Sequence, residues 1–296
     1  MHPLADLHRH LDGSLRPTTV TELAAERRLV VPPDLPFVPG MGMVEALARF
    51  RFTIKLLDTL AAIRRVASEI CEDAAAEGVG TLEIRFAPQL HGPPIEAVIE
   101  AALEGIAGRA GLILCGLYGE DPALLEHLVD AAGPGVVGLD LAGVPAPGQR
   151  FGLTDYARPF RRAVERGLGT TVHAGEGHPV AEIREAIEVL GAQRIGHGTT
   201  LLDDPAVLEL VVARGVTIEA CPTSNWHTGV IPAIEAHPLP TWLDQGVRVC
   251  VCSDNTLLSA VGAREELRRV AGLPGMTPEK LNQVVQFGQE AAFRRT

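Results

Sequence analysis

The sequence predicts a single (β/α)8 TIM barrel with a helical insertion after its first strand. Short β-rich runs alternate with longer amphipathic stretches, and polar residues collect where the runs end. Eight such units occupy the 296 residues, so residues 1–296 are expected to form one domain. A doubly wound open sheet is the structural competitor. The number of strands and the spread of polar residues over many strand ends favour the barrel.

Several of the eight expected strands are continuous apolar runs rather than strict alternations, which suits parallel strands covered on both faces. Their ranges are 4–8, 81–87, 111–117, 136–141, 169–173, 193–197, 215–220 and 246–252. Amphipathic helices are expected between them, for example at 124–131, 156–165, 180–190 and 205–213. The turn that ends a helix favours a positive φ, and the glycines that stand just before strands are Gly167, Gly191, Gly215 and Gly246.

The stretch after the first strand, residues 32–78, is longer than one crossover needs. Prolines interrupt its beginning, and residues 44–77 are expected to form two helices. We expect this insertion to cover the mouth of the barrel. A closing helix is expected at 278–295.

Composition excludes several classes of partner. Asp and Glu number 37 against 26 for Lys and Arg, and the net charge of −11 argues against binding to nucleic acid or to an anionic membrane. No apolar run approaches the ~20 residues of a bilayer span, and the N-terminal residues are too polar for a signal peptide. The 5 cysteines lack a CxxC spacing, which favours the reducing cytoplasm. A monomer or a homodimer is expected.

The residues that carry chemistry stand at the ends of expected strands, where a barrel places its active site. His8 and His10 are two apart on the first strand, so both are expected to face the barrel axis. His173 ends the fifth strand, His197 ends the sixth, and Asp254 follows the eighth. Three imidazoles and one carboxylate drawn from this set match the ligands of a zinc ion that keeps a position for water.

Each of these residues also has an ordinary structural interpretation. His197 can be a hydrogen-bonded core residue, and Asp254 with Asn255 can cap a following helix. Glu176, three residues beyond His173, can be a solvated loop residue or a carboxylate at a helix N-terminus. The purely structural interpretation requires several coincidences at one face of the barrel, and a functional site is therefore favoured.

A set of motifs occurs in order across most of the chain. They are DLHRHLDGSLRP (6–17), LEIRFAP (82–88), GLDLAG (138–143), VHAGE (172–176), RIGHG (194–198), CPTSN (221–225), TGV (228–230) and SDNTLLS (253–259). With these motifs the chain resembles the adenosine deaminase family of the metal-dependent amidohydrolase superfamily.

The resemblance implies one zinc ion per chain, and by similarity its ligands are His8, His10, His173 and Asp254. By the same similarity Glu176 protonates the purine and His197 assists the attacking water. Hydrolytic deamination adds water at C6 and expels ammonia, and zinc makes water a usable nucleophile by lowering its pKa to about 7. Attack at C6 requires protonation at N1, so the site must raise the pKa of Glu176.

The remaining roles concern the base and the sugar. Similarity assigns the Gly143 backbone to the purine ring and Asp12 to the sugar. Asn255 departs from the Asp-Asp pair of some family members, and we interpret it as a donor to purine N7 because an amide donates without first being protonated. The alternative role for Asn255 is a helix cap. Lysine-based barrel mechanisms are disfavoured, since Lys55 and Lys280 are the only lysines and lie outside the expected strands.

The expected substrate is a small molecule, adenosine or 2′-deoxyadenosine, which would give inosine or 2′-deoxyinosine and ammonia. Within the family, the sequence HLDG (10–13) is linked with ribosyl substrates. One alternative is another 6-aminopurine, such as adenine, aminodeoxyfutalosine or a modified adenosine. Two others are a purine-binding family member without turnover and a metallohydrolase of esters or cyclic amides. A 5′-phosphate is disfavoured because no basic cluster is evident.

Overall fold

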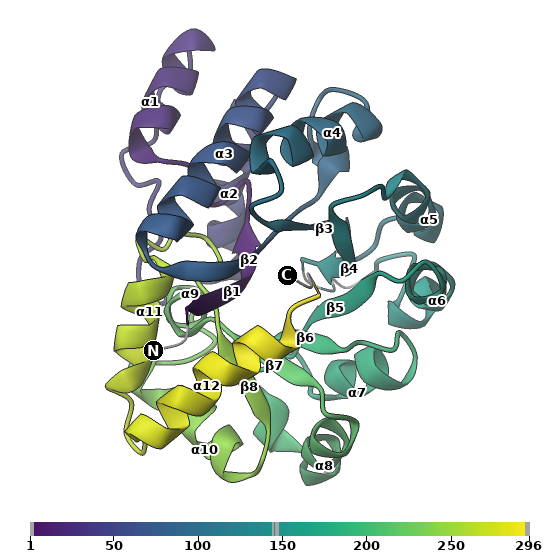
Figure 1. Ribbon diagram of the computed structural model, residues 1–296, viewed down its shortest axis with the longest axis vertical. Helices are drawn as coiled ribbons and strands as arrows, with labels where there is room; N and C mark the ends of the chain where they lie inside the picture. Colours follow the sequence, from purple (N-terminus) through teal and green to yellow (C-terminus); the bar gives the residue numbers. More distant parts are fainter. Residues whose placement is uncertain (1–2, 144, 146–147, 294–296) are drawn as a thin grey trace.

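Eight parallel strands follow one another around a barrel in the computed structural model, which describes residues 3–143, 145 and 148–293 (Figure 1). The strands are β1 (Leu4–His10), β2 (Val79–Phe86), β3 (Gly111–Leu117), β4 (Val136–Ala142), β5 (Gly169–Ala174), β6 (Arg194–His197), β7 (Thr217–Ala220) and β8 (Arg248–Val251). Each strand pairs in parallel with the next along the chain. The predicted barrel is confirmed, and every expected strand is present with small differences at its ends.

The barrel closes between β1 and the residue that follows β8. Arg9 and Asp254 form an isolated parallel bridge. Its two hydrogen bonds run from the His10 amide to the Asp254 carbonyl and from the Asp254 amide to the His8 carbonyl, each at 2.8 Å. The first and last strands are therefore joined through the backbone of three residues that the sequence proposes as metal ligands.

Helices surround the barrel, as the alternating pattern predicts (Figure 1). They are α1 (Pro17–Glu26), α2 (Met43–Leu56), α3 (Leu60–Ala76), α4 (Ile95–Ile106), α5 (Pro122–Ala131), α6 (Ala157–Glu165), α7 (Ala181–Glu188), α8 (Pro205–Arg214), α9 (Pro222–His227), α10 (Leu239–Asp244), α11 (Ala263–Ala271) and α12 (Pro278–Ala291). Short 3₁₀ turns lie at Pro88–Leu90, Leu153–Tyr156, Leu201–Asp203 and Ile234–Ala236. The four glycines expected to end helices before strands all have a positive φ, for example 63° at Gly215 after α8.

The insertion after β1 differs from the expectation in one respect. Helices α2 and α3 fill the expected range, but α3 contacts β2 and α4 and so belongs to the outer ring of the barrel. The additional elements are α2 and α1, and α1 was not expected. It begins with Pro17 at its first position, where the fixed φ of proline favours a helix start. From α2, the Phe50 ring meets the His10 ring edge-on at 6.0 Å, so this helix covers the C-terminal mouth of the barrel as expected.

The opposite end of the barrel is covered by α12, which lies across it with the last turn of the helix near the axis (Figure 1). A Cβ placed on Gly288 of α12 would lie 3.1 Å from Ala5 Cβ and 3.4 Å from Cys250 Cβ. The helix ends at Ala291, earlier than the expected 295, because Ala292 turns to extended backbone with ψ at 134°. Residues 294–296 of the expected helix lie outside the described residues.

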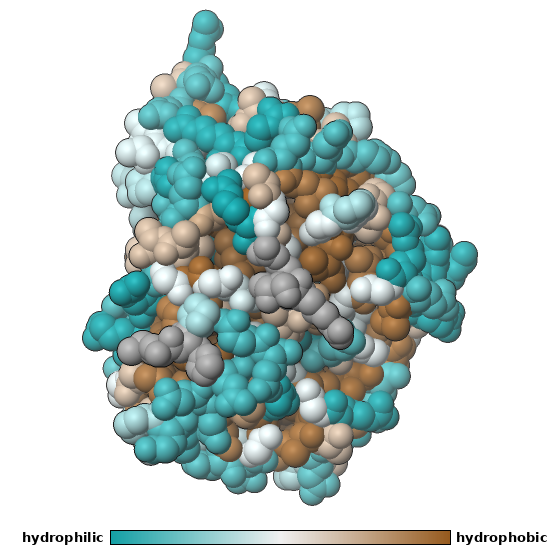
Figure 2. Space-filling view, in the orientation of Figure 1, coloured by the Kyte–Doolittle hydropathy of each residue, from teal (hydrophilic) through white to brown (hydrophobic). Residues whose placement is uncertain are grey.

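Cys250 and Cys252 pack with Cys221 in a small cluster inside the barrel, as their spacing on one strand predicts. On the face that carries α12, hydrophilic side chains cover most of the outer surface and apolar side chains show between them (Figure 2).

Within the described part of the chain, no helix combines the length and the apolar character that a membrane crossing requires.

A buried carboxylate joins α11 to α9. Glu266, 1% exposed, accepts a hydrogen bond from the Thr223 amide at 2.7 Å and another from the Thr223 hydroxyl. Burial raises the pKa of Glu266 to about 7. The folded state therefore holds this proton more tightly than the unfolded state, whose carboxyl titrates near 4.5.

We expect Glu266 to make the stability of the protein depend on pH. Its contribution to the free energy of unfolding is complete below pH 4.5 and is lost as the pH rises through about 7. The loss amounts to about 3 kcal/mol, and Glu266→Gln, which cannot ionise, should not show it. Urea unfolding of both proteins across this pH range measures the difference, and parallel pH profiles would contradict the expectation.

Candidate metal centre and active site

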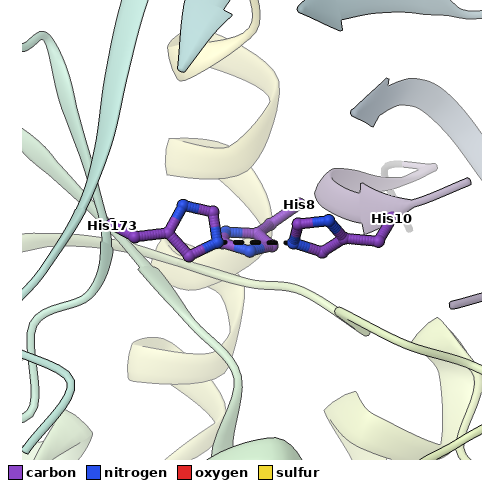
Figure 3. Close-up of side chains that lie close together, drawn as sticks. All are labelled: His8, His10 and His173. Atoms are coloured by element: carbon purple, nitrogen blue, oxygen red, sulfur yellow. Dashed lines mark hydrogen bonds between the residues drawn. The ribbon is translucent and has the colours of Figure 1, made fainter. Parts of the chain in front are cut away.

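Three imidazoles converge at the C-terminal mouth of the barrel. His8 and His10 come from β1 and His173 comes from β5, and their nitrogen atoms lie within 4.8 Å of one another (Figure 3). His10 Nε2 and His173 Nε2 are 3.3 Å apart. The spacing of two along β1 places both of its histidines on the inner face, as predicted.

A carboxylate completes the cluster. Asp254 Oδ1 lies 3.5 Å from His10 Nε2 and 3.7 Å from His8 Nε2. Tetrahedral zinc with bonds of about 2.0–2.1 Å separates its ligand atoms by roughly 3.3–3.4 Å, which is close to these distances. His8 Nε2 is also buried without a hydrogen-bond partner. The donor set and the unpartnered nitrogen fit a single cation held by four side chains.

Buried carboxylates hold the outer nitrogens of two of these rings. His8 Nδ1 lies 2.7 Å from Glu219 Oε2 on β7, and His173 Nδ1 lies 3.2 Å from Asp140 Oδ1 on β4. A ring that donates its Nδ1 hydrogen to a carboxylate keeps the Nε2 lone pair free for a metal. Arg85 of β2 joins the two carboxylates, with contacts of 3.0 Å to Asp140 and 2.8 Å to Glu219.

The electrostatics favour neutral imidazoles. Burial lowers the pKa of His8 and of His10 well below the ordinary value, and the charge on Arg85 acts in the same direction. Burial alone would raise the pKa of Asp140, but His173 and Arg85 outweigh it and hold that pKa below its usual range. Neutral imidazole is the form of histidine that binds a metal.

The buried charges around the cluster do not balance. Besides Asp12 and Glu176, whose pKa values are raised, five buried carboxylates stand against three guanidiniums: Asp6, Glu83, Asp140, Glu219 and Asp254 against Arg9, Arg85 and Arg194. Two negative charges are left in an interior of low dielectric constant, where such an excess is costly. Burial accordingly raises the pKa of Asp254. A divalent cation would supply the missing positive charge and would favour the ionised form of this ligand.

Beside the cluster, an acid and an imidazole face each other. Glu176 Oε2 lies 3.5 Å from His197 Nε2, and both residues are buried. Burial raises the pKa of Glu176 well above its ordinary value, and the charge on Asp254 adds to this. Burial lowers the pKa of His197. The site thus pairs a carboxyl whose protonated form is favoured with an imidazole whose neutral form is favoured.

Asn225 contributes to this pair, although the sequence analysis assigned it no role. Its Nδ2 lies 3.0 Å from His197 Nδ1, and its side chain also hydrogen-bonds Glu176. An amide can present either a donor or an acceptor to a ring nitrogen, so this contact fixes the orientation of the His197 ring. The feature of the sequence that could have identified Asn225 is its position in the CPTSN motif at 221–225.

Two of the candidate residues have a strained backbone. His197 has φ at 67° and Asp254 has φ at 58°, in the left-handed region that non-glycine residues seldom adopt. Such strain costs of order 1–3 kcal/mol per residue and persists where the surrounding structure enforces it. At Asp254 the enforcing contacts are the two backbone hydrogen bonds to β1.

Asp12 lies beyond His10 in a pocket of buried polar atoms. It is 2% exposed, its Oδ1 has no hydrogen-bond partner, and burial raises its pKa to about 7. His91 Nε2, also without a hydrogen bond, lies 3.8 Å from Asp12 Oδ2. The Leu57 carbonyl accepts a hydrogen bond from His91 Nδ1 at 3.0 Å, which leaves the Nε2 lone pair directed at Asp12. The sequence analysis did not identify His91.

The alternative interpretation of Asp254 and Asn255 as a helix cap does not hold. The next helix, α11, begins at Ala263 and has Gly262 in the capping position, because a turn-rich segment intervenes. Asn255 instead lies against Gly13, where an added Cβ would be 1.8 Å from Asn255 Oδ1. That oxygen has no hydrogen-bond partner, so the side chain retains capacity for a ligand.

Gly143 follows the end of β4 with φ at 79°, and among the described residues no atom beyond its chain neighbours lies within 4 Å of the position that a Cβ would occupy. These residues therefore leave the backbone at this strand end open to approach. A side chain would obstruct this approach, and the positive φ disfavours one as well.

A barrel that gathers three imidazoles, a carboxylate and an acid–imidazole pair at one mouth defines the class of metal-dependent barrel hydrolases. A family profile described as adenosine deaminase matches residues 3–295. The adenosine deaminase of Erwinia tasmaniensis is 35% identical over 319 aligned positions, which cover 98% of this chain and 94% of that protein. The chain belongs to the adenosine deaminase family.

Solved structures agree with this assignment. The adenine deaminase from Arthrobacter aurescens superposes with a TM-score of 0.90 at 25% identity, covering 100% of this chain and 95% of that chain. An amidohydrolase from Burkholderia ambifaria with bound zinc gives a TM-score of 0.88 at 25% identity, covering 99% and 86%. The family is therefore a metal-dependent one, and the chain is a hydrolytic deaminase.

We expect Asp140→Asn to weaken metal binding about 10- to 100-fold. The amide cannot accept the His173 hydrogen as a charged group, so the ring loses its fixed orientation. Zinc titration against a competing chelator measures the effect. Glu69→Gln is the matched control, because Glu69 is also buried but hydrogen-bonds Thr19 between α3 and α1. Equal zinc affinities for the wild type and Asp140→Asn would contradict the role of Asp140.

Proposed function

We propose that the protein hydrolyses adenosine or 2′-deoxyadenosine to inosine or 2′-deoxyinosine and ammonia. The observation that carries this proposal is the buried Glu176, which retains its proton and lies 3.5 Å from His197 beside the four-residue cluster. A neutral carboxylic acid in this place suits a reaction that protonates a ring nitrogen while water attacks the adjacent carbon.

The metal in this proposal is one zinc ion, held by His8, His10, His173 and Asp254. Zinc in a site of this kind supplies a water molecule whose pKa is lowered to about 7. The choice of zinc is supported by the imidazole-rich donor set and by the zinc in the Burkholderia ambifaria relative. The protein then has to place the purine and move two protons.

Glu176 supplies the first of these protons. Attack at C6 moves electrons toward N1, and the Glu176 carboxyl donates its proton there as the tetrahedral centre forms. The raised pKa keeps this carboxyl protonated near neutral pH, where an exposed glutamate would be ionised. Burying a carboxyl group destabilises an ordinary core. Here the burial of Glu176 is useful, because it keeps the carboxyl in its protonated form.

His197 accepts a proton from the attacking water. Its lowered pKa leaves the imidazole neutral and able to accept a proton through the nitrogen that faces Glu176. Asn225 holds the other nitrogen and prevents rotation of the ring. The same residue can pass the accepted proton to the leaving amine, which departs as ammonia. The remaining hydroxyl proton at C6 is released as the carbonyl forms, and it restores the Glu176 carboxyl.

The base and the sugar have separate contacts in this proposal. The Gly143 backbone meets the purine ring, and the Asn255 side chain donates to N7. Asp12 accepts a hydrogen bond from a sugar hydroxyl, with the unpartnered His91 Nε2 3.8 Å away as a second acceptor. Two buried, unsatisfied polar groups beside one another suit a ligand with a hydroxyl group, since a hydroxyl bonds what would otherwise remain unpaired.

A second candidate substrate is free adenine or a related 6-aminopurine. The Arthrobacter aurescens adenine deaminase, at a TM-score of 0.90, favours this alternative. The two candidates differ only at the sugar, so Asp12 and His91 decide between them. We place the reaction in a reducing cytoplasm, with support from the cysteines, which are odd in number and lack a CxxC spacing.

We expect the zinc-loaded protein to release ammonia from adenosine with a fall in ultraviolet absorbance. Glu176→Gln should lower kcat by about 10²- to 10⁴-fold, because the amide has no proton to donate to N1. Zinc content should be unchanged, and Glu69→Gln should remain active. Full activity of Glu176→Gln would refute the role of this residue. A zinc-loaded wild type that binds purines without releasing ammonia would favour the non-catalytic alternative.

We expect Asp12→Ala to discriminate between the candidate substrates. Loss of a buried hydrogen bond to a hydroxyl costs about 1–3 kcal/mol, so kcat/KM for adenosine should fall by roughly 5- to 150-fold. The value for adenine, which carries no sugar, should change much less. Steady-state kinetics with both compounds measure this. A wild type that prefers adenine, with Asp12→Ala equally impaired on both substrates, would contradict the sugar assignment.

A further inference from the structure

The C-terminal segment inserts an aromatic ring into the end of the barrel opposite the active site. Gly138 of β4 and Gly169 of β5 are partners in the strand register. A Cβ on Gly138 would lie 2.9 Å from the Phe293 ring, and one on Gly169 would lie 2.2 Å from it. The two glycines therefore leave a space in the barrel wall that this ring fills. Such close packing indicates that the two glycines determine the position of the Phe293 ring.

Arg194 of β6 fixes the ring from inside the barrel. Its guanidinium carbon lies 3.6 Å from the centroid of the Phe293 ring, a close cation–π contact in a buried place. Arg194 Nη1 also donates to the Ala291 carbonyl at 3.0 Å. The Phe293 amide donates to Glu83 Oε1 at 2.5 Å, and Arg194 Nη2 lies 2.7 Å from Glu83 Oε2. The end of the chain and Arg194 thus hold each other in place.

From Arg194 the contacts continue to the histidine cluster. Arg194 Nε lies 2.7 Å from Glu219 Oε1, and the other oxygen of Glu219 lies 2.7 Å from His8 Nδ1. Thr171 donates to Oε1 at 3.1 Å, and Arg85 binds Oε2. Arg194 is the charged partner of Oε1, so together with Thr171 and Arg85 it orients the carboxylate toward His8.

We propose that Phe293 and Arg194 are positioning residues for the metal centre: the ring holds the guanidinium, the guanidinium orients Glu219, and Glu219 aims His8. This inference rests on the proposed zinc site. When the ring is removed, Arg194 loses its stacking partner and the space between the two glycines opens to water. The guanidinium can then move away from Glu219, which weakens the orientation of a metal ligand at the other end of the barrel.

Helix α12, which precedes Phe293, supplies a matched control. Arg248 lies over the Phe287 ring of α12 at 4.6 Å and pairs with Glu290 at 2.7 Å. This second cation–π contact also holds α12 against the barrel, but among the described residues Arg248 makes no side-chain contact with Glu219. Phe287→Ala therefore removes a comparable contact from the C-terminal region and leaves the path to His8 intact.

The experiment compares zinc affinity and stability in Phe293→Ala and Phe287→Ala. Zinc dissociation constants are measured by competition with a chelator. The visible spectrum of the cobalt-substituted protein reports the geometry at the metal, and urea unfolding measures the stability of the metal-free protein. We expect Phe293→Ala to bind zinc about 10-fold more weakly and to alter the cobalt spectrum, with Phe287→Ala within about twofold of the wild type.

Further variants separate positioning from simple destabilisation. Gly169→Ala displaces the ring without changing it and should reproduce the loss of zinc affinity. Phe293→Leu fills part of the space without a π face and should lose less affinity, so it replaces Phe293→Ala if that variant does not fold. Zinc affinities and cobalt spectra that match the wild type in the variants of Phe293 and Gly169 would overturn the inference. A wild type that binds no zinc would instead refute the proposed function on which it rests.

Discussion

The contact between His8 and Glu219 is the interaction on which the site depends. It fixes which nitrogen of His8 faces the centre of the cluster, and it places a full negative charge deep in the barrel. That charge requires Arg85, which in turn engages Asp140, the residue that orients His173. One carboxylate thus organises imidazoles from two strands. Buried ion pairs of this kind add little net stability, so this network is better understood as fixing geometry.

The site destabilises the folded state, and packing in the rest of the fold offsets this. Strain at His197 and Asp254, a protonated Glu176 and unpaired polar atoms at Asp12 all oppose folding. The compensating burial is that of the apolar side chains between the strands and the outer helices, which form one continuous cluster. The chemistry is confined to the mouth of the barrel, which α2 covers, while packing occupies the layer outside the strands.

The sequence predicted the barrel and the residues at strand ends because both follow from local patterns. Apolar runs separated by helical stretches define strands, and histidines spaced by two share a face. The pairing of the interior charges could not be predicted, because it does not follow from a local pattern. A glutamate in TIEA (217–220) or an arginine in LEIRF (82–86) does not show from its own strand which partner it meets, because Glu219 and Arg85 are paired only once the barrel has closed. Likewise His91 becomes relevant only when its loop folds toward Asp12.

The bridge between Arg9 and Asp254 also has a consequence for biosynthesis. Its two halves come from the beginning and the end of the chain, so a nascent polypeptide on the ribosome carries His8 and His10 long before it carries their carboxylate partner. Until residue 254 has been translated, these histidines lack the carboxylate that lies beside them in the folded chain. The four side chains of the proposed site can therefore come together only after synthesis has passed Asp254 and the barrel has closed.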